Sequence, residues 1–321
     1  MKAIFLRRFG PPEELRLEDV PDPEPGPGEV RIAVAAAGTN PVDAGNRTDG
    51  SWAGIELPFV LGYDVAGVVD SLGADVDGFD VGDTVMAMTG FPRGAGGYAE
   101  LVIADSDLVA KLDPGTDLVR AAATPLAGGT ALEVLERLAV PSGGTMLVLG
   151  ASGGVGHFLV QLASHAGLEV IAVGSRTSHE RMRALGAAAC IDYATEDVPA
   201  RVTKAAGGPV DAIADLVGAD HLTRSLGVLA RHGSAASIAT PELDLDLVLD
   251  RNITFHGVLI EDDGDRTRRL GELLANGVLR PHVSHELPLR EAARAHRLLE
   301  SGHPGGKVVL VVDASRVTDD R

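Results

Sequence analysis

The segment from Thr145 to Ala163 constrains the fold of this 321-residue chain more than any other feature. It begins with a short apolar run, continues through Gly153, Gly154 and Gly156, and ends in an apolar helical pattern. Glycines at these positions let the backbone turn sharply and approach a pyrophosphate, whose charge the amino end of the following helix stabilises. A glycine run alone can be a plain surface turn. The strand before it, the helix after it and the further strand–helix units downstream together predict a dinucleotide-binding site.

The chain divides into two patterns of secondary structure. Residues 119–265 alternate short apolar runs with helical patterns, which is typical of a parallel sheet covered on both faces. Residues 1–118 consist of short strands bounded by Gly, Pro and Asp, and the tail 266–321 adds two helical patterns and a final strand at 307–312. The predicted fold is therefore α/β. A doubly wound parallel-sheet domain at 119–265 is inserted into a β-rich unit made of 1–118 and 266–321, provided that the last strand returns to that unit.

The end of the second strand of this sheet indicates which cofactor is preferred. In NAD-binding sheets an acid about 20 residues beyond the glycines accepts a hydrogen bond from the ribose 2′-hydroxyl. Here the strand that contains Val170 ends in Ser175 and Arg176, and no carboxylate appears before Glu180. Arg176 can pair with a 2′-phosphate through a forked, charge-assisted contact, whereas an acid would repel that phosphate. The sequence thus favours NADPH over NADH, with an ordinary solvated loop arginine as the alternative interpretation.

Net charge limits the classes of binding partner that are expected, and cysteine content indicates the cellular compartment. With 28 basic and 46 acidic residues the formal net charge is −18, which repels phosphate backbones and anionic lipids, so neither nucleic acid nor a membrane is expected as a partner. The single cysteine, Cys190, excludes an internal disulfide and fits a reducing cytoplasm. No export segment or apolar run of about 18 residues is visible, so a cytoplasmic protein is expected. Three acids, Asp244, Asp246 and Asp250, alternate with leucines and predict an exposed strand face.

Motifs spread over nearly the whole chain resemble one family. They include AGTNPVD at 37–43, PFVLGYDVAGVV at 58–69, GGYAE at 96–100, PLAGGTA at 125–131, SGGVG at 152–156 and GKVVL at 306–310, in family order. Together they resemble the zinc-independent quinone oxidoreductase (zeta-crystallin-like) branch of the medium-chain dehydrogenase/reductase superfamily. The resemblance implies a GroES-like β-rich substrate domain and an inserted Rossmann-type NADPH-binding domain. It also implies a homodimer that pairs through edge strands of the nucleotide-binding sheet.

The same resemblance bears on catalytic metal. Zinc-dependent relatives carry a cysteine, a histidine and a glutamate near positions 40, 63 and 64, followed by a lobe with four cysteines. This chain has Asn40, Tyr63 and Asp64 there and only one cysteine. The sulfur and imidazole ligands that catalytic zinc prefers are missing, so no metal is expected. Without this Lewis acid, acceptors that take hydride unaided, namely quinones and α,β-unsaturated carbonyls, are expected in place of alcohols.

The resemblance also assigns roles to individual residues. It places Asn40 and Thr130 near the nicotinamide, Ser152, Gly153, Gly154 and Val155 against the pyrophosphate, and Ser175, Arg176 and Tyr193 around the adenosine 2′-phosphate. Phe255 and Lys307 are expected to close the nicotinamide side. Asn40 and Tyr63 are the candidate catalytic residues, with Tyr63 or water as the proton source for an enone. Structural alternatives remain: Asn40 can fix a turn before Pro41, Thr130 can cap a helix that begins near Ala131, and Tyr193 can pack at a strand end.

The residues and the resemblance together predict an NADPH-dependent, zinc-independent oxidoreductase that transfers hydride to a quinone or an α,β-unsaturated carbonyl. In such a reaction catalysis comes mainly from holding the acceptor against the nicotinamide. Two alternatives stay open. One is a pathway-specific enoyl or ketone reductase of secondary metabolism, and the other is a sensor or structural protein that binds NADPH without turnover. Fold and cofactor do not separate them, because loop side chains determine the substrate.

Overall fold

The computed structural model describes residues 1–302 and 304–317, which form two compact units. Unit 1 comprises Met1–Gly129, Glu261–Gly277 and Pro281–Arg321, and unit 2 comprises Thr130–Ile260 and Val278–Arg280. The sequence placed the boundaries at 118/119 and 265/266. The structure differs because two helices near these points, α2 (Leu118–Ala122) and α9 (Gly264–Ala275), pack on strands of unit 1. Across the described residues, none of the helices has the length and apolar character that a membrane span requires.

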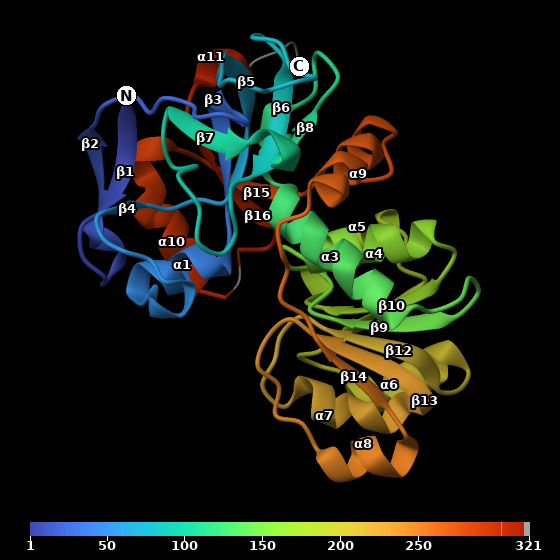
Figure 1. The fold of residues 1–321 in the computed structure, drawn as a ribbon. Helices are drawn as coiled ribbons and strands as arrows, with labels where there is room; N and C mark the ends of the chain where they lie inside the picture. The colour runs from blue at the N-terminus through green and yellow to red at the C-terminus, as the bar shows by residue number, and fades with distance from the viewer. Residues whose placement is uncertain (303, 318–321) are drawn as a thin grey trace. The chain divides into compact units, whose positions relative to one another are not determined.

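Unit 2 is built on a parallel sheet, whose six described strands lie in the order β11-β10-β9-β12-β13-β14 (Figure 1). β9 is central, and the chain winds outward from it first to one side and then to the other. This is the strand order of a dinucleotide-binding sheet, and it confirms the predicted doubly wound domain. The strands are β9 (Thr145–Leu149), β10 (Glu169–Gly174), β11 (Ala189–Asp192), β12 (Val210–Asp215), β13 (Leu229–Ser237) and β14 (Thr254–Gly257).

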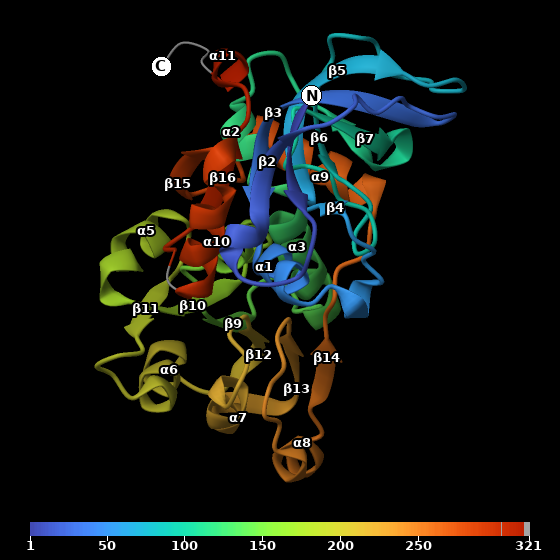
Figure 2. The ribbon, with the colours of Figure 1, turned by 90° about the vertical axis from the view of Figure 1, so that its left-hand side faces the viewer.

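Helices cover both faces of this sheet. On one side lie α4 (Gly156–His165) and α5 (His179–Ala184), and on the other lie α6 (Val198–Ala206) and α7 (His221–Ser225) (Figures 1 and 2). The central strands are apolar along their length because both faces are buried: in β9 every residue after Thr145 is buried. Two more helices complete the unit. α3 (Pro125–Leu138) crosses its first boundary, and α8 (Leu245–Arg251) packs on β13.

Unit 1 is β-rich and contains two sheets. The larger has the order β15-β16-β3-β5-β6-β8, with β7 also paired to β3, and the smaller has the order β2-β1-β4. β16 runs antiparallel to β3, with Val308 opposite Thr39, so the tail strand returns to the β-rich unit as predicted. The strands are β1 (Lys2–Leu6), β2 (Leu15–Asp19), β3 (Glu29–Thr39), β4 (Phe59–Val60), β5 (Asp64–Leu72), β6 (Thr84–Met88), β7 (Leu101–Asp105), β8 (Val109–Lys111), β15 (Val283–Pro288) and β16 (Lys307–Val311).

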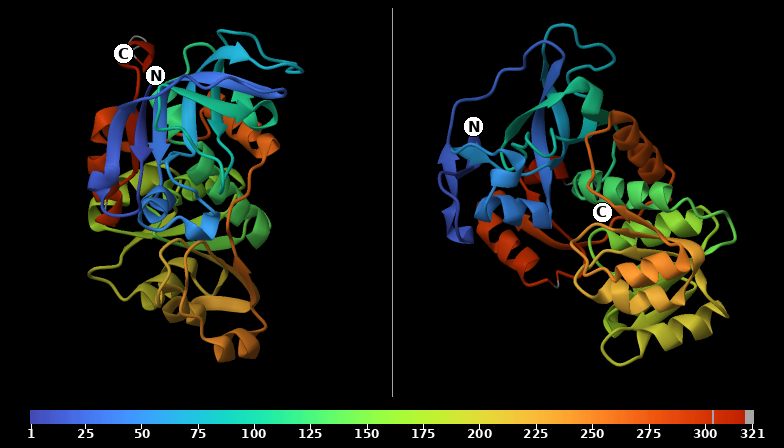
Figure 3. Two further views of the ribbon diagram at one scale, coloured as in Figure 1. Left: turned by 60° about the vertical axis from the view of Figure 1, so that its left-hand side comes forward. Right: turned by 60° about the horizontal axis from the view of Figure 1, so that its bottom comes forward.

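Helices also contribute to unit 1, which the sequence predicted as all-β up to residue 118. α1 (Pro41–Thr48), drawn in blue, lies against α10 (Ala292–Glu300), drawn in red (Figure 3). A short α11 (Ala314–Val317) follows β16. Asn40 precedes α1 as its N-cap and Pro41 is the first helical residue, where its fixed φ suits a helix start. The predicted turn at Asn40 is therefore the start of a helix.

Two further local predictions are wrong. The acids Asp244, Asp246 and Asp250 do not form a strand face, because Asp244 caps α8 by accepting hydrogen bonds from the backbone N–H groups of Asp246 and Leu247. Thr130 does not cap a helix that begins near Ala131, since α3 begins at Pro125 and Thr130 lies inside it.

Candidate cofactor and active site

The glycine turn connects β9 to α4, and its central residues, 152–155, are accessible to solvent. Gly150 has a φ of +78°, which glycine adopts without strain, and the backbone N–H of Gly153 bonds to the Gly150 carbonyl at 3.1 Å. A Cβ added to Gly156 would stand 2.3 Å from that same carbonyl oxygen, so the helix can start this close only with glycine there. The candidate pyrophosphate contacts, residues 152–155, are all partly exposed between these buried ends. The turn thus presents backbone to a ligand at the amino end of α4.

The predicted 2′-phosphate residues lie at the ends of two neighbouring strands. Gly174, the last residue of β10, is paired with Asp192, the last residue of β11. Ser175 and Arg176 follow the first strand and Tyr193 follows the second, so the fold brings the three residues to one edge of the sheet. Leu149 of β9 is paired with Val173 of β10, which puts the glycine turn at the same edge.

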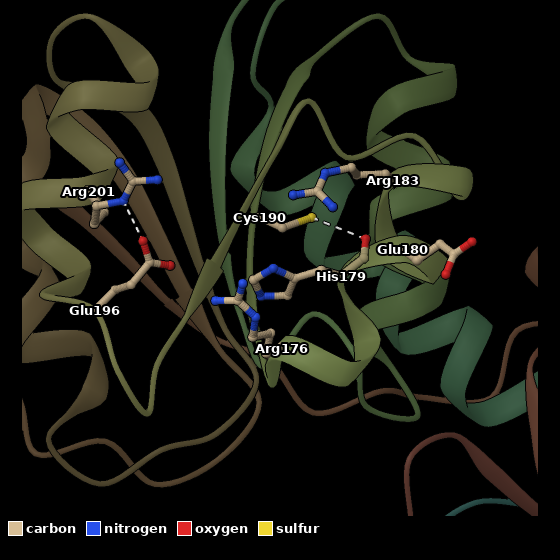
Figure 4. A pocket seen from close by; sticks show the side chains of 7 residues that line it. All are labelled: Arg176, His179, Glu180, Arg183, Cys190, Glu196 and Arg201. Carbon is tan, nitrogen blue, oxygen red and sulfur yellow. Dashed lines mark hydrogen bonds and ion pairs between the residues drawn. The ribbon is translucent and has the colours of Figure 1, made fainter.

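A pocket of about 450 Å³ adjoins Arg176 (Figure 4). Its lining comes from α5, β11, α6 and the turns beside them, and consists of Arg176, His179, Glu180, Arg183, Cys190, Glu196 and Arg201. Three arginines and a histidine outnumber two glutamates, of which Glu196 is paired with Arg201 at 2.6 Å. The surroundings of the predicted 2′-phosphate contact are therefore rich in cationic side chains.

Asp192, the last residue of β11, lies beside Gly174, and its carboxylate already has hydrogen-bond partners. Its carboxylate accepts hydrogen bonds from the Thr195 hydroxyl at 2.8 Å and from the Ala194 backbone N–H at 3.1 Å. These bonds, with the charges of His179 and Arg176, hold the pKa of Asp192 below its usual value. The carboxylate is ionised at neutral pH, but it faces its own turn and its side chain is nearly fully buried.

The remaining cofactor candidates in unit 2 lie apart from this edge. Thr130 is buried within α3. Phe255 lies inside β14, opposite Ala235 of β13, and its ring packs against the apolar core of the unit. Neither residue belongs to the turns after β9, β10 and β11, so their predicted contacts with the nicotinamide remain predictions.

Unit 1 holds a buried polar cluster of Asn40, Asp64 and Lys307. The Lys307 ammonium donates to Asn40 Oδ1 at 2.6 Å and to the Thr39 carbonyl at 3.1 Å, and it lies 3.4 Å from Asp64 Oδ2. Asn40 Nδ2 donates to the same Asp64 oxygen at 2.9 Å. Asp64 Oδ1 accepts from the Leu126 backbone N–H at 2.7 Å. Every polar atom of the Asn40 amide group is thus directed, with its oxygen toward Lys307 and its nitrogen toward Asp64.

Burial controls the charges in this cluster. The side chains of Lys307 and Asp64 are 3% and 0% exposed. Burial lowers the pKa of Lys307, while the carboxylates of Asp64 and Asp43 oppose that shift. Asp43 is also fully buried, and burial raises its pKa to about 7, although it accepts a hydrogen bond from the Asn40 backbone N–H at 2.8 Å. Sequence reasoning placed Asn40 and Lys307 in the site but missed Asp43 as a member, and it noted Asp64 only as a replaced zinc ligand.

Tyr63, the candidate proton donor, is fully buried and has both hydroxyl roles filled. Its O–H donates to the Pro92 carbonyl at 2.9 Å and accepts from Asn46 Nδ2 at 2.6 Å. Burial raises the pKa of Tyr63 above its ordinary value, and the Asp43 charge raises it further. Tyr63 precedes Asp64 in the chain, but its hydroxyl is directed toward Asn46 and Pro92 and makes no hydrogen bond to Asn40.

No trio of His, Cys, Asp or Glu side chains with metal-binding geometry occurs within residues 1–302 and 304–317. At the positions where zinc-dependent relatives carry ligands, the fold instead places an amide, a phenol and a carboxylate bonded to lysine. This donor set lacks the sulfur and imidazole groups that zinc prefers.

Comparisons with known proteins cover nearly the whole chain. Residues 26–114 match the family described as "Alcohol dehydrogenase GroES-like domain", and residues 185–310 match the family described as "Zinc-binding dehydrogenase". A "2-methylene-furan-3-one reductase" of Solanum lycopersicum is 33% identical over 97% of this chain and 79% of its own length. A chloroplastic "NADPH-dependent alkenal/one oxidoreductase" of Arabidopsis thaliana is 32% identical over the same shares. The chain belongs to the medium-chain dehydrogenase/reductase superfamily.

Solved structures of this superfamily agree with the assignment. A quinone oxidoreductase from Coxiella burnetii is 36% identical with a TM-score of 0.89, covering 97% of this chain and 99% of its own. A mycobacterial structure complexed with NADPH is 31% identical with a TM-score of 0.85, covering 97% and 100%. Within the superfamily the chain falls in the branch of quinone oxidoreductases and alkenal reductases, which confirms the predicted family and fold. NAD(P) is the cofactor of this family.

Proposed function

We propose that this member of the superfamily is an NADPH-dependent, zinc-independent reductase of quinones or α,β-unsaturated carbonyls. Two electrons and two protons convert a quinone to a hydroquinone. For an enone, hydride is delivered to the β-carbon and a proton to the α-carbon. Bound NADPH supplies the hydride in either case. The names of the relatives support this acceptor class, because they include a quinone oxidoreductase and an alkenal/one oxidoreductase.

The residues after β9, β10 and β11 fit such a cofactor. The partly exposed backbone of residues 152–155 at the amino end of α4 suits the pyrophosphate. Ser175, Arg176 and Tyr193 suit the adenosine end, and Tyr193 is half exposed there. One observation carries the preference for NADPH: the turn after β10 offers an arginine and no carboxylate, in a pocket rich in cationic side chains.

The buried cluster in unit 1 supports a role for Asn40 near the reacting atoms. Its amide is held from both sides by Lys307 and Asp64, so it keeps one orientation without rearranging during the reaction. The hydroxyl proton of Tyr63 is donated to the Pro92 carbonyl. This arrangement favours water over Tyr63 as the source of the proton that an enone requires.

An acceptor panel tests the function. Purified protein is mixed with NADPH and 1,4-benzoquinone, 9,10-phenanthrenequinone, an acyclic enone, a ketone or a primary alcohol, and NADPH oxidation is followed at 340 nm. We expect turnover with the quinones or the enone, and the same rates after treatment with a chelator. Binding of NADPH without turnover over the whole panel would support the sensor alternative. Activity that chelation removes and zinc restores would overturn the metal-free assignment.

Arg176→Ala tests the cofactor preference. Loss of a charged hydrogen bond should weaken NADPH binding by about 1.5–3 kcal/mol and leave NADH binding nearly unchanged. Arg224→Ala is the matched control, because Arg224 is an exposed arginine of α7 that pairs with Asp220. Dissociation constants for both nucleotides are measured by calorimetry. Equal losses for NADPH and NADH would refute the assignment of Arg176 to the 2′-phosphate.

A further inference from the structure

His157 is a fully buried histidine in the first turn of α4, directly after the glycine at which the helix begins. Its imidazole Nδ1 lies 3.0 Å from the carbonyl oxygen of Gly153. A carbonyl oxygen only accepts hydrogen bonds, so Nδ1 carries a proton and is the donor. A side chain of α4 thus reaches back to the glycine turn that precedes the helix.

The Gly153 carbonyl accepts two hydrogen bonds from this one residue. The second comes from the backbone N–H of His157 at 3.2 Å. Both lone pairs of the oxygen are therefore used. Gly153 and Gly154 lack a Cβ, and a peptide between two glycines has the widest choice of backbone conformations. The imidazole consequently adds a restraint at the point where the backbone alone restrains the turn least.

Fixing this carbonyl also fixes the backbone N–H of Gly154. The peptide between Gly153 and Gly154 is trans, and in a trans peptide the C=O and the N–H point in opposite directions. Because the Gly153 oxygen is held toward His157, the Gly154 N–H is directed away from α4. Gly154 is partly exposed, so this donor is open to a ligand at the amino end of the helix.

The turn engages its carbonyls with protein donors and leaves its N–H groups available. Besides the Gly153 carbonyl, that of Ser152 is engaged, because it accepts a hydrogen bond from Arg181 Nη2 at 3.3 Å. Within the described residues, no acceptor is found for three backbone N–H groups of the turn, those of residues 152, 154 and 155. A turn with engaged carbonyls and available N–H groups suits an anion.

We propose that His157 is a positioning residue for the cofactor, which holds the peptide between Gly153 and Gly154 so that the Gly154 N–H donates to the pyrophosphate. This inference rests on the proposed function, in which residues 152–155 receive the pyrophosphate. A donor that is oriented before binding adds no ordering cost when the ligand arrives. NADPH and NADH share the pyrophosphate, so His157 contributes to the affinity for both, whereas Arg176 contributes to the affinity for NADPH alone.

Three variants of His157 test the proposal by calorimetry, which needs no hydride acceptor. His157→Leu removes the Nδ1–H and should raise the dissociation constants of NADPH and NADH by the same factor, about tenfold. His157→Asn should bind both nucleotides within about threefold of wild type, because its side-chain nitrogen corresponds to Nδ1. His157→Gln, whose nitrogen corresponds to Nε2, should bind both as weakly as His157→Leu. This comparison of two amides keeps the test decisive if His157→Leu does not fold.

Gln161→Leu is the matched control, because Gln161 is a buried polar residue one turn further along α4. Its side chain donates to the His157 carbonyl at 2.8 Å and accepts from the Arg280 N–H at 2.8 Å. Losing these bonds should lower the midpoint of thermal unfolding and change either dissociation constant by less than about twofold. If affinity fell with stability alike in Gln161→Leu and in the His157 variants, His157 would only support the fold, and the proposal would be overturned.

The outcomes separate this inference from the proposed function. Unaltered affinities in His157→Leu and His157→Gln, or a loss confined to NADPH, would refute the positioning role and leave the reductase function in place. Nucleotide binding without turnover of any acceptor would refute the reductase function, and the affinities of the variants would still decide the role of His157. A wild-type protein that binds neither nucleotide would overturn both.

Discussion

At the residue scale, two of the positions that hold zinc ligands in metal-dependent relatives are occupied here by Asn40 and Asp64, and both residues bond the buried Lys307. Lys307 and Asp64 have side chains 3% and 0% exposed, and each also bonds Asn40. Removing charges from water is expensive, and a buried pair is tolerated only when both partners are present and hydrogen-bonded. The pair consequently holds Asn40 in place while adding little to net stability.

A double-mutant cycle measures this coupling. Lys307→Met should reduce the free energy of unfolding by about 3–5 kcal/mol, because it leaves the buried Asp64 carboxylate without its cation. Combining it with Asp64→Asn should restore much of the loss, since the carboxylate that Lys307 balanced is then gone. Urea denaturation at pH 7.5 of the wild type, both single variants and the double variant gives the four values. Additive losses would show that the two residues do not act as a pair.

A second buried network begins at Asp43, which accepts a hydrogen bond from the Asn40 backbone N–H, and it extends to His296 of α10. Asp43 is hydrogen-bonded to Tyr98, whose hydroxyl lies 3.3 Å from His296 Nε2, and Arg47 Nη1 lies 3.3 Å from His296 Nδ1. Burial raises the pKa of Asp43 to about 7, and burial with the Arg47 charge lowers the pKa of His296 to about 3. Both groups are therefore neutral near pH 5, although both would be charged there in the unfolded chain.

These two shifts have opposite effects on stability. Between about pH 4 and 7 the folded Asp43 holds a proton that the unfolded residue has lost, so its contribution falls as the pH rises. Between about pH 3 and 6.5 the folded His296 lacks a proton that the unfolded residue binds, so its contribution rises with pH. Asp43→Asn removes the first effect alone. Relative to wild type, the variant should gain about 1.4 kcal/mol per pH unit from pH 4.5 to 6.5 in chemical denaturation. A difference that is constant with pH would mean that Asp43 titrates normally.

At the element scale, local sequence patterns predict the elements whose partners lie close in the chain. Short apolar runs at 84–88, 145–149 and 210–215 predict strands from the sequence alone, and β6, β9 and β12 have these bounds. The two-residue alternation of acids and leucines after Asp244 favoured a strand, but the Asp244 cap and the packing of Leu247 on the core select a helix. β15 gives no such signal, since its residues VSHELP lack alternation and its pairing with β16 depends on tertiary structure.

The residues of the candidate site likewise divide into those that local sequence predicts and those that only long-range strand pairing brings together. Ser175, Arg176 and the glycine turn are near in sequence to the strands that present them, so the pattern predicts them. The bond from Lys307 to Asn40 spans 267 positions and that from Lys307 to Asp64 spans 243. No local pattern encodes such a contact. The pairing of β16 with β3 and of β3 with β5 brings these residues together.

Two glycines of one turn should respond differently to alanine. Gly156→Ala places a Cβ 2.3 Å from the Gly150 oxygen and should cost about 2–3 kcal/mol of stability, because backbone must shift. In Gly153→Ala the added Cβ stands 3.3 Å from that oxygen, so the free energy of unfolding should fall by less than about 1 kcal/mol. NADPH binding should nevertheless weaken about tenfold or more, because the Cβ occupies the turn that faces the pyrophosphate. Gly227→Ala, with no atom within 4 Å of its Cβ, is the control. Thermal unfolding and nucleotide titration distinguish the two effects. Equal stability losses at 153 and 156 would contradict this account of the turn.

At the scale of the whole molecule, no further strand among the described residues pairs with the outer side of β14 in the unit 2 sheet. β14 ends the strand order, and exposed backbone at a sheet edge invites pairing with another strand. Three leucines near it are strongly exposed: Leu245 at 63%, Leu249 at 72% and Leu259 at 61%. Leu245 and Leu249 are four residues apart on α8, so they share one helix face. This edge fits the homodimer that the family resemblance implies, in which β14 of two chains would meet.

The oligomeric state tests that arrangement. Wild-type protein should elute with a mass about twice the 33.1 kDa of the chain in light scattering coupled to gel filtration. Leu249→Lys should shift it toward the monomer, because two lysines that meet across a twofold axis repel each other. The substitution changes the net charge of −18 per chain by only one unit, so its effect is local. Leu17→Lys, which alters an exposed leucine of unit 1, should leave the mass unchanged. A monomeric wild type, or a Leu249→Lys protein that remains a dimer, would exclude this edge as the interface.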